Sequence, residues 1–170
     1  LPAAAVLANT LPATAQPFAT ATAGPWFLDP VKVPSGATAA TFAARFRLDA
    51  LPPTGGYTLF SQSGATFDLL ILNNGNLRVS VRDGAGVTVL ANTAIAAALA
   101  AGVWHDVVAA VDQAGQVFRL RLNGAPVATL PFTAAGNGRL DANRAVSFLA
   151  KNNGTVQFVG QVETLRVWFS

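Results

Sequence analysis

Beyond its first two dozen residues, the chain alternates hydrophobic and polar side chains with the period of two that is typical of β-strands. In the segment 38–48, Phe42 and Phe46 fall on one face of the strand. Arg45 and Arg47 fall on the opposite face. Similar patterns between turn residues predict strands at 38–48, 57–63, 66–72, 77–83, 87–90, 104–112, 117–122, 127–132, 145–151 and 155–169. Many short strands with almost no helix indicate an all-β protein, either an antiparallel sandwich or a barrel.

Asparagine and glycine mark the connections between these strands. Asn123 and Gly124 form the strongest hairpin signal, because both residues tolerate a positive φ. The segments 73–76 and 152–154 have the composition of further turns. The alanine-rich segment 94–101 is the one helix candidate, with length for one or two turns.

The first 24 residues differ from the rest in composition, because they consist mainly of Ala, Thr and Pro. Prolines at positions 2, 12 and 17 prevent a continuous helix, so an extended conformation is expected. We therefore divide the chain into an extended N-terminal arm, 1–24, and a sandwich domain, 25–170. The arm is expected to pack on this domain or on a neighbouring subunit through Val6, Leu7, Leu11 and Phe18. The alternative is a linker from an upstream domain.

The low charge content limits the partners that the surface suits. Only 11% of the residues are charged, against about 25% in a typical soluble domain. This indicates either an alanine-rich sequence or a subunit that its neighbours cover. The net charge is +3, but the basic residues are scattered and no nucleic-acid motif accompanies them, so we expect no nucleic-acid binding. The charge-free segment 1–28 is interrupted by prolines, and the charge-free segment 84–104 contains glycines and an asparagine. Neither segment is therefore predicted to span a membrane.

An ordered set of motifs in the second half of the chain resembles a known family. Gly102-Val103-Trp104-His105 begins one strand, and an Asp-containing turn at 112–115 follows. The next strand, 118–124, ends in Asn-Gly, and the closing strand, 160–168, reads GQVETLRVW. This pattern is similar to that of laminin-G-like members of the concanavalin A-like lectin/glucanase superfamily. The resemblance implies a jelly-roll sandwich of two antiparallel sheets, with Trp104 and Trp168 in the core and His105 half exposed.

Catalysis and metal binding find little support in the acidic residues and the histidine. Glycoside hydrolysis needs two carboxyl groups that flank the scissile bond, but Glu163 is the only glutamate and no two acids lie within three residues of each other. His105 is the only histidine, so a site with several histidine ligands is excluded. We therefore predict no enzyme activity and no cofactor. Calcium, the usual metal of the family, remains the alternative, and it would need loops that bring single acids together.

Arginines and two aromatic residues are the candidate ligand-binding residues. Alternation places the arginine pairs of two predicted strands on the polar faces of these strands. If the two strands belong to one sheet, four guanidinium groups share a face that suits an acidic polysaccharide or an acidic protein surface. The alternative is a solvated face on which arginine provides solubility. Two aromatic residues near turns are expected to be exposed and to stack on sugar rings. The candidate residues are Arg78, Arg82, Arg119, Arg121, Tyr57 and Trp26.

These observations predict a non-catalytic surface recognition module that binds glycans or is adhesive, outside the cell or on a particle surface. The alternative is a structural subunit, such as a decoration, spike or fibre protein of a virion-like particle or an extracellular filament. Self-association, or contact with neighbouring subunits, is expected through residues 1–24.

Overall fold

The computed structural model describes residues 33–62, 67–83, 85–133, 138–140 and 158–170, and the backbone of three short strands at 5–7, 16–18 and 146–148. The described residues form twelve strands and no helix. The strands are β1 (Ala5–Leu7), β2 (Gln16–Phe18), β3 (Ala39–Leu48), β4 (Gly56–Gln62), β5 (Phe67–Leu72), β6 (Leu77–Arg82), β7 (Thr88–Ile95), β8 (Trp104–Asp112), β9 (Val117–Leu122), β10 (Ala125–Pro131), β11 (Val146–Phe148) and β12 (Gly160–Phe169). Among these residues, no helix is long and apolar enough to cross a membrane.

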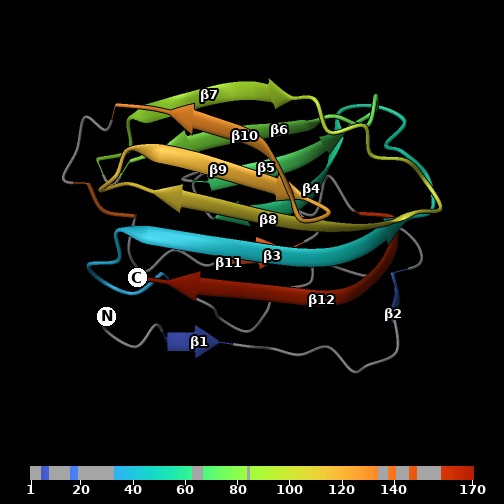
Figure 1. The fold of residues 1–170 in the computed structure, drawn as a ribbon, viewed down its shortest axis with the longest axis horizontal. Helices are drawn as coiled ribbons and strands as arrows, with labels where there is room; N and C mark the ends of the chain where they lie inside the picture. The colour runs from blue at the N-terminus through green and yellow to red at the C-terminus, as the bar shows by residue number, and fades with distance from the viewer. Residues whose placement is uncertain are drawn as a thin grey trace.

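Two antiparallel sheets lie face to face (Figure 1). The seven-stranded sheet has the order β1-β12-β3-β8-β9-β10, and β2 also pairs with β12. The five-stranded sheet has the order β11-β4-β5-β6-β7. The prediction of an antiparallel jelly-roll sandwich is therefore confirmed.

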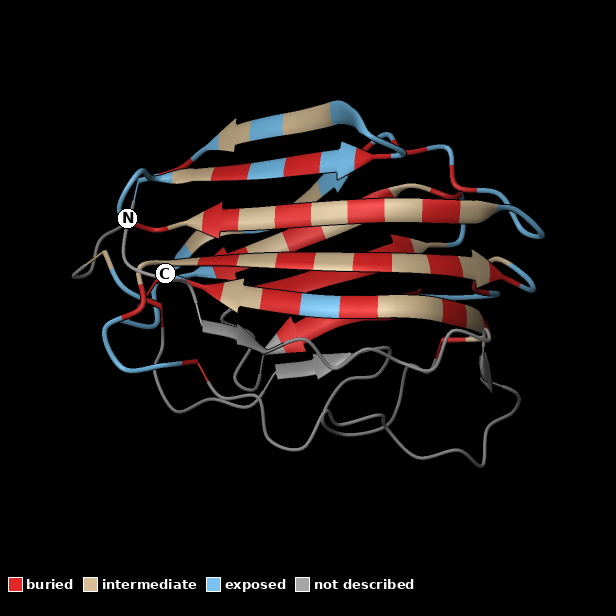
Figure 2. Ribbon diagram, turned by 60° about the horizontal axis from the view of Figure 1, so that its bottom comes forward, coloured by how far each residue is buried: buried red, intermediate tan, exposed pale blue. Residues whose placement is uncertain are grey.

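The core fills the space between the sheets with the inward side chains of alternating strands. Along β3 and β8, buried and half-buried residues alternate without interruption (Figure 2). The rings of Phe42 on β3 and Phe67 on β5 stack with their centroids 4.8 Å apart, which joins the two sheets. Phe46 meets the edge of Phe158 at 5.7 Å. Contacts between aromatic rings add to the energy of area burial, so the Phe42–Phe67 pair helps to hold the two sheets in one relative position.

The connection between β9 and β10 is the predicted hairpin. Asn123 has a φ of 50° and Gly124 a φ of 81°. Two successive positive φ values match the twist of the flanking strands, so the Asn-Gly signal predicted this turn correctly.

The helix predicted at 94–101 is wrong. Strand β7 continues to Ile95, and residues 96–100 form no regular element. Ala97 and Leu99 are buried, whereas the residues on either side of each are exposed. The Leu99 N–H donates to the carbonyl oxygen of Gly75 at 2.8 Å, so the segment bonds to a neighbouring turn and not to itself. Alanine is compatible with the periodicity of a helix and with that of a strand. Tertiary contacts therefore determine the conformation of this segment.

The edge of the seven-stranded sheet at β12 is covered by both N-terminal strands. β1 pairs with residues 167–169 and β2 pairs with residues 160–162. Two segments of the predicted arm thus add to this domain by backbone pairing. The predicted packing of Val6, Leu7, Leu11 and Phe18 concerns side chains outside the described residues.

The strands β10 and β7 end the two sheets on the opposite side, at the top of Figure 1. β10 carries Pro126 and Pro131, which have no N–H to donate. β7 is irregular, because its register with β6 shifts twice and Asn92 has a φ of 44°. Prolines and bulges are devices that protect an edge from further strand pairing.

Candidate functional site

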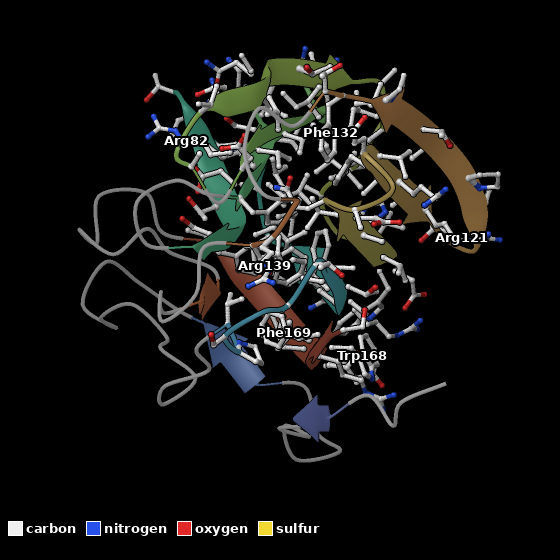
Figure 3. The ribbon with its side chains drawn as sticks, turned by 90° about the vertical axis from the view of Figure 1, so that its left-hand side faces the viewer. Arg82, Arg121, Phe132, Arg139, Trp168 and Phe169 are labelled. Carbon is white, nitrogen blue, oxygen red and sulfur yellow. The ribbon has the colours of Figure 1, made fainter. Side chains whose placement is uncertain are left out.

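The four arginines that would share one face if their strands belonged to one sheet are divided between the two sheets. Arg78 and Arg82 lie on β6 of the five-stranded sheet, whereas Arg119 and Arg121 lie on β9 of the seven-stranded sheet. Figure 3 shows Arg82 and Arg121 on different sides of the sandwich. Alternation along each strand was predicted correctly, but alternation does not say which sheet a strand joins. The common face of four arginines is therefore wrong.

The two aromatic residues do not provide the expected exposed pair. Tyr57 points into the core, is 7% exposed and meets the edge of Phe158 with centroids 6.0 Å apart. Burial, and to a smaller extent the charge of Asp49, raises the pKa of the Tyr57 hydroxyl above 10.0. Its predicted exposure is wrong, because it pairs with Ile71 on the inward face of the five-stranded sheet. Trp26 lies outside the described residues.

The outer face of the seven-stranded sheet gathers a different set of arginines. Across the four strands β12, β3, β8 and β9, one row of cross-strand partners runs from Trp168 to Arg119. The neighbouring row runs from Arg166 to Arg121. Further along β3, Arg45 and Arg47 point to the same side. The outward positions of the described strands in this sheet thus carry Arg45, Arg47, Arg119, Arg121 and Arg166, against the carboxylates of Asp106, Asp112 and Glu163.

One end of this face holds a compact group that we name the Trp104 cluster: Arg45, Arg47, Trp104, Asp106 and Glu163. The Arg45 Nη1 donates to Asp106 Oδ2 at 2.7 Å, and the Arg45 Nε donates to Glu163 Oε2. The guanidinium carbons of Arg45 and Arg47 lie 5.6 and 5.8 Å from the centre of the Trp104 ring. Guanidinium groups at this distance from an indole are attracted by its π electrons, so the group is held together by charge and by stacking.

Trp104 and His105 have exchanged the positions that the family resemblance implied. Trp104 is half-buried on the outer face, whereas His105 is 4% exposed and points into the core. The His105 Nε2 lies 3.0 Å from the carbonyl oxygen and 3.2 Å from the amide nitrogen of Ala100. Both expectations are wrong. The sequence already indicated this arrangement. His105 is separated from Val107 and Val111 by an even number of positions, so all three side chains point to the same face of a strand.

The other end of the same face is hollowed beside Trp168. Trp168 is half-buried and points outward, whereas Val167 and Phe169 enter the core, so its predicted core position is wrong as well. Short side chains on β3 and β8 leave a hollow of about 440 Å³ beside the indole. It is lined by Thr41, Ala43, Val108, Trp168, Phe169 and Ser170.

The acidic residues of the face are already engaged in contacts. Asp106 and Glu163 come from β8 and β12 and meet at the single guanidinium of Arg45. The sequence analysis named no pair of acids distant in the chain, so this pair was not predicted. Asp112 accepts the Gly115 N–H at 2.7 Å in the turn after β8. Among the described residues, no group of three or more His, Cys, Asp or Glu side chains is placed to hold a metal ion. Two acids, Asp29 and Asp141, lie outside that part of the chain.

The arrangement provides aromatic and cationic groups on one open sheet face. An indole offers an apolar plane for stacking, and arginine forks match carboxylates, sulfates or phosphates.

Comparison with known proteins identifies the relatives of this fold. The family model described as the concanavalin A-like lectin/glucanases superfamily matches residues 25–170. No protein with a curated description matches the sequence.

Three solved structures illustrate the likeness. A heptameric SAP-like pentraxin from Limulus polyphemus has a TM-score of 0.61 and 16% identity, covering 83% of this chain and 67% of that chain. The CBM40 domain of the Ruminococcus gnavus IT-sialidase, bound to α2,3-sialyllactose, has a TM-score of 0.58 and 22% identity, covering 76% of this chain and 75% of that chain. The leech intramolecular trans-sialidase has a TM-score of 0.63 and 20% identity over 85% of this chain, but only 24% of that chain is covered. At these identities the likeness shows the fold.

Proposed function

The chain belongs to the concanavalin A-like lectin/glucanase superfamily, and we propose that it acts within that family as a non-catalytic module that recognises acidic glycans. The proposed binding surface is the outer face of the seven-stranded sheet. We further propose that the module is displayed outside the cell or on a particle surface, where it has an adhesive role.

The observation that carries this proposal is the Trp104 cluster. Its indole is held half-buried on an open sheet face by two guanidinium groups. An indole fixed in this way loses little conformational entropy when a ligand stacks on the part of the ring that the two guanidinium groups leave uncovered.

The charge of the face supports an acidic ligand. Arg45 is paired with two carboxylates, whereas Arg47, Arg119 and Arg166 have no carboxylate partner within the described part of the chain. Guanidinium groups without a carboxylate partner favour ligands that bring their own carboxylate. A similarly folded carbohydrate-binding domain is bound to sialyllactose, an acidic sugar, which agrees with this choice.

The engagement of the acids supports a binding role over a hydrolytic one. A glycosidase holds one carboxyl group protonated as its general acid. Asp106 and Glu163 both contact the Arg45 guanidinium, so each already has a cationic partner. The carbohydrate-binding domains among the structural relatives are in keeping with a module that is not an enzyme.

Calorimetry with the full chain tests the proposal. The panel contains sialyllactose, oligogalacturonate and heparin fragments as acidic glycans, and cello-oligosaccharides as neutral ones. We expect binding of at least one acidic glycan, and Trp104→Ala should weaken it about tenfold, which equals about 1.4 kcal/mol. Val87→Ala is the control, because it trims an exposed apolar side chain next to the five-stranded sheet. Absence of binding to the whole panel at millimolar concentration would refute the proposal.

The second candidate is a structural subunit of a particle or filament. It rests on the charge content of 11%, which is low for a free monomer. Mass photometry of the full chain separates the two candidates. A stable monomer favours the recognition module, whereas regular higher assemblies without added glycan favour the structural subunit.

A further inference from the structure

The outer face of the seven-stranded sheet carries two tryptophans. Trp104 lies beside one end of β3, and Trp168 lies beside the other end. Trp104 pairs across the sheet with Arg47, whereas Trp168 pairs with Thr41. At about 3.3 Å per residue, the stretch of β3 from Thr41 to Arg47 is about 20 Å long. The two indoles are thus too far apart to contact one small sugar.

Between the two indoles, the outward positions of β3 are occupied first by Ala43 and then by Arg45, whose guanidinium is paired with Asp106 and Glu163. Ala43 on β3 and Val108 on β8 are direct cross-strand partners in the middle of this stretch. Their outer neighbours in the same row are Arg166 on β12 and Arg121 on β9, which are both exposed. We name as the channel the strip of this face that runs parallel to the strands from the hollow beside Trp168, over this row and past the paired Arg45, to Trp104.

The charges along this channel are arranged for a ligand with repeated anionic groups. Arg166 has no hydrogen-bond or carboxylate partner among the described residues. Arg121 donates from Nε and Nη2 to the carbonyl oxygen of Gly124, at 3.2 and 2.6 Å, which fixes its guanidinium and leaves further N–H groups for a ligand. Arg47 lies at the far end, over Trp104. Cationic groups therefore recur along the channel, and the two carboxylates in its middle, Asp106 and Glu163, are both paired with Arg45.

We propose that this channel binds one extended acidic oligosaccharide along the strands, with Trp104 and Trp168 as its two aromatic contacts. This inference rests on the proposed function and makes it more specific, because the ligand is an internal stretch of a polyanionic glycan and not a single terminal sugar. Each sugar beyond the first gains contacts with further arginines, and finally with the indole of Trp168.

Two series of oligosaccharides of increasing length test this inference by calorimetry on the full chain: oligogalacturonate and α2,8-linked oligosialic acid. In at least one series, the affinity should rise at least tenfold from the monosaccharide to the octasaccharide and level off once the ligand covers the channel, with one ligand per chain. The longer ligands should also show the steeper loss of affinity with added salt, because they contact more guanidinium groups.

Variants separate one long site from two short ones. Trp168→Ala should reduce the affinity for the octasaccharide about tenfold and leave the affinity for the shortest binding member unchanged. Arg82→Ala, which removes an exposed arginine from the five-stranded sheet, should change neither. A fully length-independent affinity, two ligands per chain, or equal effects of Trp168→Ala on short and long members would overturn the extended site while leaving glycan binding intact. Binding of sialyllactose without either series would overturn it in the same way, whereas binding of neutral glycans alone would overturn the proposed recognition of acidic glycans as well. If nothing in the panel or in either series binds, the proposed function fails as well.

Discussion

At the residue scale, the Arg45 guanidinium organises the outer face of the seven-stranded sheet. It accepts no hydrogen bond and donates several, so one side chain can hold Asp106 and Glu163 at once. Its two partners are 48% and 39% exposed, and exposed ion pairs contribute little to stability. We therefore interpret Arg45 as a positioning residue, which keeps carboxylates away from Arg47 and supports the indole of Trp104.

Tyr57 is the only tyrosine in the chain, so its ionisation can be followed without interference. Burial raises its pKa, and the charge of Asp49 adds to the effect. We expect the midpoint of tyrosinate formation in the folded protein to lie above pH 10, whereas the denatured protein should titrate near about 10. Asp49→Asn should lower the folded midpoint in part, because burial is the larger cause. A folded midpoint equal to the denatured one would contradict the burial of Tyr57.

The raised pKa of Tyr57 also determines how the free energy of unfolding changes with pH in the alkaline range. Between the unfolded and the folded pKa, the folded state holds the proton of Tyr57 and the unfolded state has lost it. The free energy of unfolding therefore falls as the pH rises above about 10. Tyr57→Phe should remove this part of the fall, which denaturant titrations at pH 9 and pH 11 would show.

At the element scale, the hairpin between β9 and β10 depends on backbone conformations that glycine and asparagine adopt most easily. Gly124 has a φ of 81°, and no neighbouring atom lies within 4 Å of the position a Cβ would take. Gly124→Ala should therefore cost about 1–2 kcal/mol through backbone strain and not through a clash. Urea unfolding measures this loss, and an unchanged midpoint would show that the turn tolerates the side chain.

The N-terminal arm is the second element whose role is open to test. β1 and β2 cover the edge of β12, which would otherwise present unpaired backbone groups. Deletion of residues 1–24 should lower the melting temperature, by about 2–4 °C for each kcal/mol lost, or dissolve an oligomer. Light scattering should report self-association of the truncated chain wherever the bare edge recruits a strand. If the truncated and full chains melt and sediment alike, the arm is a linker.

The elements could be predicted from the sequence more completely than their arrangement. Alternation predicted the strand at 104–112 with the bounds that β8 has, because one face of a half-buried strand needs a strict period of two. It could not show that β6 and β9 belong to different sheets, since both alternate in the same way. The candidate site was affected most: Arg45 and Asp106 meet although they are 61 positions apart in the chain. The alternation of apolar and polar residues along β8 can be seen in the sequence, and it would have placed Trp104 on the outer face of the sheet.

At the scale of the whole molecule, the sandwich uses one sheet for support and presents the outer face of the other. On the five-stranded sheet, the outward residues Thr58 and Asp68 are buried, and Ser61 donates to Asp68 at 2.5 Å. On the seven-stranded sheet, arginines and two half-buried indoles lie on the outer face. This asymmetry is the reason for assigning recognition to the seven-stranded sheet.

Calcium gives a whole-molecule prediction. The described residues form no group of three ligating side chains, and the proposed contacts are stacking and arginine–carboxylate pairs. We expect the melting temperature and the glycan affinity to be the same in EDTA and in millimolar calcium. A rise in either value on adding calcium, absent with magnesium, would indicate a site formed by loops that include residues beyond the described part.

The central claim is that the outer face of the seven-stranded sheet, and not that of the five-stranded sheet, binds the acidic glycan. Arg47 and Arg82 form a matched pair, because each is an arginine at an outward strand position, on opposite sheets. The most direct test is the dissociation constant of one acidic glycan from the Arg47→Ala and Arg82→Ala variants at low salt. The account predicts about tenfold weaker binding for Arg47→Ala and an unchanged constant for Arg82→Ala. Weaker binding for Arg82→Ala alone would contradict it.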